Sequence, residues 1–332
     1  DIKIAKNGLG IGAALVKSGV TSGAEVAGLD GGTEQDRLFN DGQIELRAVS
    51  AQADAVGVSV GLVGTTNGVS IAAGVADGSS TASAAARGLV GGSGDDLAVN
   101  RGGIVIDKVD ARGNATAVSV GLAGANNGIA ASVTLADSSA NAIALAAGID
   151  GGEGDDRLWN EGGITIGQVK ARAGAVTADV SLSGTLSGGL AAGAALGRSA
   201  AIAEARVTGM DGGSGADLIA SRGETGILVD DVAATASATG VSVQLGVVSN
   251  GAAIGAALVD TSTTARTTVT GLQGGAGDDA VLNAGSLTLR NLKAEASAVS
   301  VGVGVNAALS AGVAGGLAWV DGKGTAALQV AG

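Results

Sequence analysis

A repeat of about 60 residues runs along the chain and limits the folds open to it. Pairs of glycines mark the repeat at intervals of 60, 60, 61 and 62 residues: Gly31-Gly32, Gly91-Gly92, Gly151-Gly152, Gly212-Gly213 and Gly274-Gly275. Self-similarity at a fixed period is typical of solenoids, propellers and other arrays. We therefore interpret residues 1–332 as one continuous repeat array, with repeat loops that begin near residues 31, 91, 151, 212 and 274 and partial repeats at both ends.

The repeat from Gly91 to Asp150 shows the expected elements most clearly. A loop at 91–100 precedes an alternating stretch at 104–122, and a second alternating stretch follows at 129–136. Between the two stretches lies Asn127-Gly128, and Asn-Gly between alternating runs is the strongest short-range signal for a turn. The alternation favours strands, because a helix would spread the polar residues of the first stretch round its whole surface.

Composition narrows the way these strands can pack. The chain has 61 glycines and no proline, cysteine or histidine, yet 46% of its residues are hydrophobic. One face of the first stretch is almost entirely small: Val109, Ala111, Gly113, Ala115, Ala117, Ser119 and Gly121. Small side chains reach native packing density only where backbones approach closely. We predict an all-β, tandem-repeat β-solenoid, in which strands of roughly eight residues would allow two or three coils per repeat; the alternative is an array of long antiparallel β-hairpins.

A second set of alternating positions is aliphatic, and its place in the fold is open. The set consists of Val118, Val120, Leu122, Ile129, Val133 and Leu135. We expect these side chains to fill the interior of the solenoid. The alternative is a lateral surface that pairs neighbouring fibres.

The residue types that are missing exclude much chemistry. Without histidine or cysteine the chain has no imidazole base, thiolate nucleophile or soft-metal site, so we expect no enzyme activity. The net charge of −12 disfavours nucleic acid and anionic membranes as partners and suits a cation. The uncharged run from Val299 to Val320 is long enough for a membrane helix. It repeats the Val-Ser-Val-Gly pattern of the earlier strands, so we expect strands there and no membrane insertion.

Acidic glycine loops follow the glycine pairs. Four of them read GGSGDDLAV from Gly91, GGEGDDRLW from Gly151, GGSGADLIA from Gly212 and GGAGDDAVL from Gly274. They resemble the nonapeptide G-G-x-G-x-D-x-U-x of the RTX (repeats-in-toxin) family, which binds Ca²⁺ on a parallel β-helix. The resemblance implies that calcium is held by the aspartates Asp96, Asp156, Asp217 and Asp279. It also implies that carbonyls are turned toward the ion by the glycines Gly92, Gly94, Gly152, Gly154, Gly213, Gly215, Gly275 and Gly277, and that the apolar residue two positions after the aspartate, such as Leu158, points inward.

The loops depart from the RTX pattern in two respects. The first loop has Glu34 where the third glycine belongs, although Asp36 occupies the ligand position. RTX motifs run in tandem and neighbouring turns share each ion, whereas here one motif occurs per repeat. If a repeat were several coils deep, each ion would need further ligands from its own repeat, and the candidates are Asp95, Asp155, Asp278, Asn100, Asn160 and Asn283. The alternative is a set of β-turns in which Asp and Asn make local hydrogen bonds.

The rest of each repeat carries a second resemblance. Segments such as GITIGQVKARA from Gly163 and DTSTTA from Asp260 are similar to repeats of leukotoxin-type and filamentous-haemagglutinin-type adhesins of giant bacterial surface proteins. The resemblance implies a secreted, cell-surface segment of a filament, matrix fibre or adhesin stalk, stabilised by calcium and by self-association into fibres or lateral bundles, with a possible host or cell-surface ligand. The alternative is a calcium-dependent repeat region of a secreted toxin or exoenzyme whose activity lies outside this segment. We expect the few large side chains, Phe39, Trp159, Met210 and Trp319, to pack locally rather than to contact a ligand.

Overall fold

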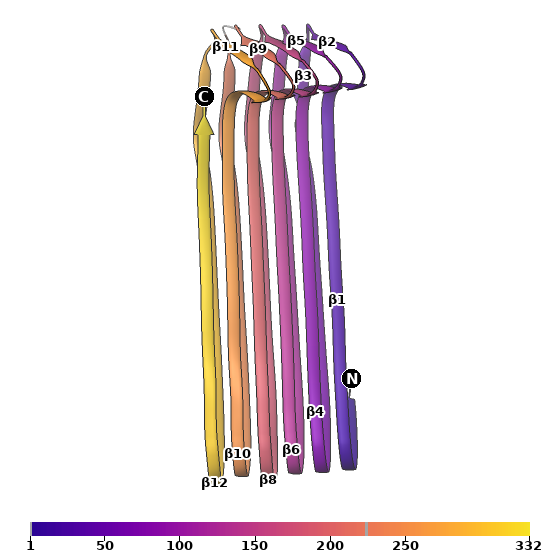
Figure 1. Ribbon diagram of the computed structural model, residues 1–332, viewed down its shortest axis with the longest axis vertical. Coiled ribbons are helices and arrows are strands. Elements are labelled where there is room, and N and C mark those ends of the chain that lie inside the picture. The colour runs from indigo at the N-terminus through magenta and orange to yellow at the C-terminus, as the bar shows by residue number, and fades with distance from the viewer. Residues whose placement is uncertain (1, 223–224) are drawn as a thin grey trace.

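The protein folds as a flattened parallel β-solenoid (Figure 1). The computed structural model describes residues 2–222 and 225–332. Its long strands are β1 (Ile2–Thr33), β4 (Val49–Ser93), β6 (Gly103–Glu153), β8 (Gly163–Ser214), β10 (Ile227–Ala276) and β12 (Leu287–Ala331). Its short strands are β2 (Arg37–Asn40), β3 (Gln43–Leu46), β5 (Leu97–Asn100), β7 (Arg157–Asn160), β9 (Leu218–Ser221) and β11 (Ala280–Asn283).

Parallel pairing joins each repeat to the next in register. The long strands lie in the order β1-β4-β6-β8-β10-β12, with β3 paired to β6, and the other short strands form a second sheet in the order β11-β9-β7-β5-β2. Val49 pairs with Val109, and Asp77 pairs with Asp137. One repeat is therefore one coil. The predicted solenoid is confirmed, a repeat contains fewer coils than the two or three that typical strand lengths would allow, and the antiparallel hairpin array is excluded.

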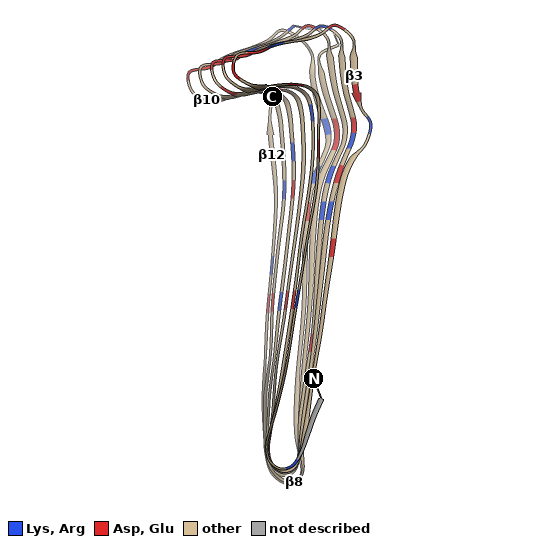
Figure 2. Cartoon of the chain, turned by 90° about the vertical axis from the view of Figure 1, so that its right-hand side faces the viewer, with Lys and Arg blue, Asp and Glu red and all other residues tan. Residues whose placement is uncertain are grey.

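Each long strand is folded back on itself at a glycine. In β6 a descending arm runs to Asn127, the chain turns at Gly128, and an ascending arm returns; Figure 2 shows the two limbs meeting at this turn end. Gly128 has a φ of 124°, and a Cβ there would collide with the carbonyl oxygen of Gly68 in the neighbouring coil. The predicted Asn-Gly turns are thus confirmed, and stacking as well as backbone conformation requires the glycine. The arm is long because every second residue from Val109 to Ala125 is buried without interruption.

The gap between the two arms is filled by small side chains. Ala111, Ala115 and Ala117 are at most 1% exposed and face inward, as predicted for the small face. Larger residues enter the interior at the opposite, loop end, where Leu89, Ile104, Ile106, Ile149, Leu158, Ile164 and Ile166 are fully buried. The large apolar side chains of the interior are therefore concentrated near the loops.

Toward the turn end the interior becomes polar. Ser59, Ser119, Asp179 and Ser242 form one inward column, because each pairs with the next in the parallel register. Hydroxyls in this region bond to main-chain carbonyls across the gap: Ser181 Oγ donates to Ser132 O at 3.1 Å, and Ser242 Oγ donates to Ala195 O at 2.9 Å. These bonds satisfy buried polar groups where no large apolar side chain fits.

The aliphatic set points outward. Ile129 is 40% and Val133 48% exposed, and Val118, Val120 and Leu122 alternate with the buried Ser119 and lie on the outer face. The expectation that these residues fill the interior is wrong. The physical reason is the narrow gap between the arms, which is filled mainly by Ser, Gly and Ala, with Val63 and Val248 as larger exceptions.

The uncharged run from Val299 to Val320 lies within β12, as expected from its alternating pattern. Across residues 2–222 and 225–332, no helix combines the length and the apolar character that crossing a bilayer requires.

We predict that Asp179→Ser stabilises the solenoid at pH 8. Asp179 is fully buried in a column of serines, and burial raises the pKa of its carboxyl to about 8, an effect that the main-chain amide of Ala136 only partly offsets. Between pH 4 and pH 8 the unfolded chain gives up this proton while the folded chain keeps it, so stability falls as pH rises. The variant should gain a few kcal/mol at pH 8 and much less at pH 4, measured by thermal melting. An equal gain at both pH values would contradict the assignment.

Candidate functional site

The acidic glycine loops stack directly on one another at the loop end. Each loop joins a long strand to the following short strand, as in the segment from Ser93 to Leu97 between β4 and β5. Because one repeat is one coil, Asp36, Asp96, Asp156, Asp217 and Asp279 lie on consecutive coils and form one aspartate column. Motifs that lie one repeat apart in the sequence are therefore neighbours in space. They are separated by the distance between neighbouring strands, about 4.8 Å.

Hydrogen bonds connect the members of the aspartate column. The amide of Asp96 donates to Oδ1 of Asp156 at 2.8 Å, and the amide of Asp156 donates to Oδ1 of Asp217 at 2.8 Å. The same bond joins Asp36 to Asp96 at 2.7 Å and Asp217 to Asp279 at 3.0 Å. One oxygen of each of the last four carboxylates thus holds the preceding loop in register.

The second oxygen of these carboxylates is buried without a hydrogen bond. Among the described residues, no partner exists for Oδ2 of Asp36, Asp96, Asp156 and Asp217. Each Oδ2 lies against the first glycine of its own loop: a Cβ added to Gly91 or Gly151 would come within 2.6 Å or 2.5 Å of it. The first glycine of the pair therefore makes room for the carboxylate.

Burial makes the ionised form of this column costly. Desolvation raises the pKa of Asp156 to about 7 and also raises the pKa of Asp96 and Asp217, while the neighbouring carboxylates add repulsion. The amide bonds to Oδ1 act in the opposite direction. A stack of this kind is stable at neutral pH when its charge is neutralised by protons or by a cation.

The outer aspartates form a second, solvent-exposed row. The amide of Asp155 donates to Oδ1 of Asp95 at 2.9 Å, and the amide of Ala216 donates to Oδ1 of Asp155 at 2.8 Å. Asp278 is also exposed, one residue before the column member Asp279. These carboxylates link successive loops from the outside.

The predicted loop glycines give the loops their shape. All of them have positive φ, from 101° at Gly213 to 136° at Gly277: Gly92, Gly94, Gly152, Gly154, Gly213, Gly215, Gly275 and Gly277. The amides of Gly94, Gly154 and Gly215 donate to carbonyls of the next coil at 2.7–2.8 Å. Glu34 takes the place of a glycine in the first loop with a φ of 81°, and Asp36 still joins the column.

The asparagines at the loop ends belong to a different ladder. Asn40 Nδ2 donates to Asn100 Oδ1 at 2.7 Å, Asn100 Nδ2 donates to Asn160 Oδ1 at 2.8 Å, and Asn160 Nδ2 donates to Ser221 Oγ at 3.3 Å. The side chains of Asn100 and Asn160 are buried and stack on the polar side chains of neighbouring coils, so they do not serve as ligands of a cation at the aspartate column. Asn283 is exposed, and its Oδ1 accepts the amide of Gly285 at 3.1 Å. Leu158, in contrast, points inward and is fully buried, as predicted.

Two further aspartates near the column escaped the sequence analysis. Asp150 and Asp211 pair with each other in the register of β6 and β8 and immediately precede their glycine pairs. Burial and the nearby Asp150 raise the pKa of Asp211 to about 6, and Asp217 adds to the effect. Arg87 binds Asp150 at 3.0 Å. The available signal was the recurrence of Asp before Gly-Gly at Asp30, Asp150 and Asp211.

The donor chemistry of the column fits a hard cation in part. The buried Oδ2 atoms are carboxylate oxygens, the ligands that Ca²⁺ prefers. Within the described part of the chain, no group of three or more acidic side chains is placed to hold a metal ion by itself. Asp96, Asp156, Asp217 and Asp279 could each supply one oxygen, and main-chain carbonyls and water would have to complete the shell.

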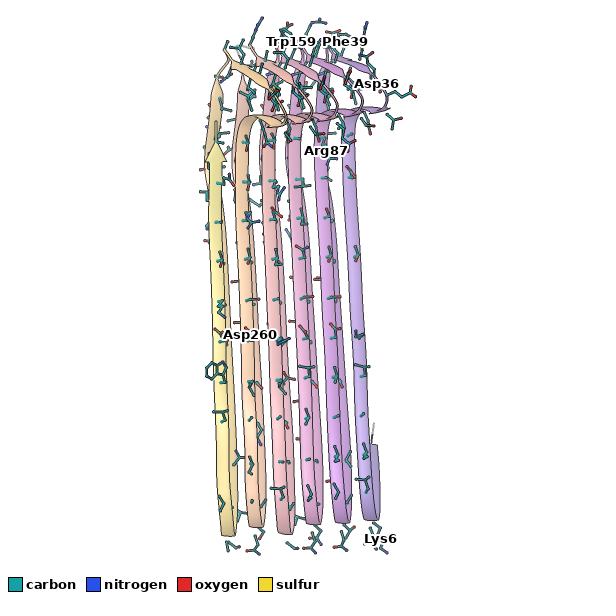
Figure 3. All side chains as sticks on the ribbon, in the orientation of Figure 1. Lys6, Asp36, Phe39, Arg87, Trp159 and Asp260 are labelled. Carbon is teal, nitrogen blue, oxygen red and sulfur yellow. The ribbon has the colours of Figure 1, made fainter. Side chains whose placement is uncertain are left out.

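The large side chains near the loops pack locally. Arg101 lies over the ring of Phe39 at 5.7 Å, and Arg222 lies over the ring of Trp159 at 5.2 Å; Figure 3 places both rings at the loop end. Met210 is fully buried, whereas Trp319 is 62% exposed on β12. The two loop aromatics therefore serve as platforms for arginines of neighbouring coils.

No protein-family model, curated protein or solved structure matches this chain. Membership of the RTX or adhesin families therefore stays a prediction from the motifs.

We predict that Gly151→Ala destabilises the protein and that Gly124→Ala does not. A methyl group on Gly151 would meet Asp156 Oδ2 at 2.5 Å and also press on the carbonyl of Gly212, whereas no described atom lies within 4 Å of a methyl group on Gly124. Overpacking of this kind costs about 1–3 kcal/mol. Thermal melting of the two variants beside the native chain measures the difference. Equal melting temperatures for both variants would show that the carboxylate does not occupy this position.

Proposed function

We propose that this chain is a structural segment of a secreted bacterial surface fibre or matrix, and that calcium braces the aspartate column. The observation that carries the proposal is the stack of buried carboxylates, which places one unpartnered oxygen on each of four coils, at Asp36, Asp96, Asp156 and Asp217. A mechanical role needs neither an imidazole nor a thiol, and the sequence contains neither.

The shape of the coil favours a broad fibre over a slender stalk. Each coil uses a whole repeat, of which 45 residues lie in the folded strand β4, yet it advances the solenoid by only about 4.8 Å. The arms are long in the perpendicular direction, as Figure 1 shows. A spacer would extend further with far fewer residues. Most residues of this repeat instead widen the solenoid and enlarge its lateral surface.

Strength in such a fibre comes from the backbone ladders. Every pair of adjacent long strands is joined along most of its length by parallel pairing. Stability in a repeat array is close to a sum of neighbour terms, so damage to one coil stays local. Calcium at the aspartate column would neutralise adjacent carboxylates and lock the loops in the same register as the arms.

The binding of calcium also has a place in the secreted setting that we propose. Anything that binds the folded chain alone stabilises it, by about 2.7 kcal/mol when its concentration is one hundred times the dissociation constant. Ion binding would therefore favour the folded solenoid wherever calcium is abundant.

We predict that EDTA lowers the melting temperature relative to CaCl₂, and that Asp156→Asn removes part of the difference. The substituted side chain would keep an oxygen to accept the Asp96 amide while losing the charge that attracts the ion. Asp260→Asn is the matched control, because it removes the same charge from an exposed position on the arm, far from the loops (Figure 3). Identical melting of the native chain in EDTA and in CaCl₂ would overturn the calcium brace.

A further inference from the structure

The descending arms carry an aliphatic surface on their outer side near the turn end. It consists of the three rows that pass through Val118, Val120 and Leu122 of β6 and continue at the paired positions of β4, β8, β10 and β12; we name these rows the valine face. Side chains at its margins are well exposed, with Val58 at 53% and Val305 at 50%. Valine or leucine occupies almost every position of these rows.

The valine face belongs to a part of the fold whose polarity is inverted. The inward neighbours of these rows are mostly small or polar, such as Ser119, while most of the large apolar side chains lie outside. In the described coils, no charged side chain points outward between the row of Val56 and the row of Thr66, as the sparse colouring near the turn end in Figure 2 also shows. Exposing an apolar area of this extent to water is unfavourable in free energy. Contact with another apolar surface removes this cost.

The face is flat and large enough to support a stable contact. Its strands run side by side with little twist (Figure 1), and flat sheets of several strands are typically stabilised by stacking. The charge-free band spans about ten residues and five strands, or roughly 33 Å by 24 Å. That is about 800 Å² on one partner, the size of a standard protein interface.

The rows of side chains on the valine face form ridges and grooves that match those of a second valine face. The rows stand about 7 Å apart along the strands, so the rows of one sheet can lie between those of another. Beside the leucine row, Gly64, Gly124 and Gly184 line a groove of about 790 Å³ that runs across the coils. The groove gives room for a leucine row such as that of Leu122 and Leu182 from the partner.

The turn end argues against a lipid bilayer as the partner. Insertion along the arms would carry the exposed amides of Asn67 and Asn127 into hydrocarbon. Asn127 Nδ2 donates to Asn67 Oδ1 at 3.3 Å, and Asn67 Nδ2 donates to Asn7 Oδ1 at 3.3 Å. Burying such amides in lipid is costly. Stacking of two sheets leaves them in water.

We propose that the valine face packs, sheet on sheet, against the valine face of a second copy of this chain. The inference rests on the proposed fibre function and names the surface through which solenoids would associate sideways.

Sedimentation equilibrium of the native chain and of Val120→Lys/Val243→Lys at about 50 µM tests the proposal. We expect the native chain to be at least dimeric and the double variant to dissociate at least about 100-fold more readily, because lysines would be buried without partners. Val133→Lys/Ile202→Lys is the matched control: both side chains point outward from ascending arms and are 48% exposed, and both lie outside the valine face. Circular dichroism and melting temperature check the fold of each variant.

A second variant protects the test against misfolding. Val120→Thr/Val243→Thr keeps β-branched side chains, and threonine already points outward on the same side of these arms at Thr116 and Thr239. We expect weaker association, by about tenfold, with unchanged circular dichroism. A native chain that is monomeric, or a folded lysine variant that associates as well as the native chain, would overturn the proposal.

The remaining outcomes separate this proposal from the calcium brace and from lipid binding. If the native chain is a folded monomer that CaCl₂ still stabilises, the stacking of valine faces is overturned and the calcium brace is not. If the native chain associates and its melting temperature is the same with and without EDTA, the stacking is supported and the calcium brace is overturned. Flotation of a monomeric native chain with phosphatidylcholine vesicles, lost in the lysine variant, would assign the valine face to a membrane and overturn the second copy.

Discussion

Parallel, in-register pairing of each repeat with the next is the constraint on which the rest of the structure depends. Once Val49 pairs with Val109 and Asp77 with Asp137, every side chain stacks on its equivalent about 4.8 Å away. A residue that suits one coil therefore recurs at the paired position of many others, as Leu62, Leu122 and Leu182 do. The turn glycines show this strictly, because a side chain on Gly128 would strike the neighbouring coil.

Stacking also decides how polar groups are treated. Asparagines at the loop ends satisfy one another, and hydroxyls near the turn end bond to carbonyls across the narrow gap. Aspartates cannot satisfy one another in this way, since each carboxylate repeats the charge of its neighbour. Main-chain amides bind one oxygen and the other is buried without a partner; this burial, together with the neighbouring carboxylates, raises the pKa of Asp156.

Much of the fold followed from the sequence, and the reasons for the failures are physical. Alternation and Asn127-Gly128 predicted the strands and their turn, and the small face of Ala111 and Ala115 was correctly placed at close backbone contact. Parity separates two faces of a strand without saying which one is inside, so Val118 and Val120 were assigned to the interior. Typical strand length suggested several coils per repeat, whereas an uninterrupted pattern forms arms as long as the pattern itself.

The sequence by itself determined the repeat, the strand pattern, the turn glycines and the positions of the loop aspartates, because each is set by local conformation or by periodicity. The tertiary structure alone decided that one repeat is one coil, and this follows from which residues hydrogen bond across 60 positions. That single fact brought Asp96, Asp156 and Asp217 into one column. The column is not visible in any one repeat, because it arises from the contact between repeats.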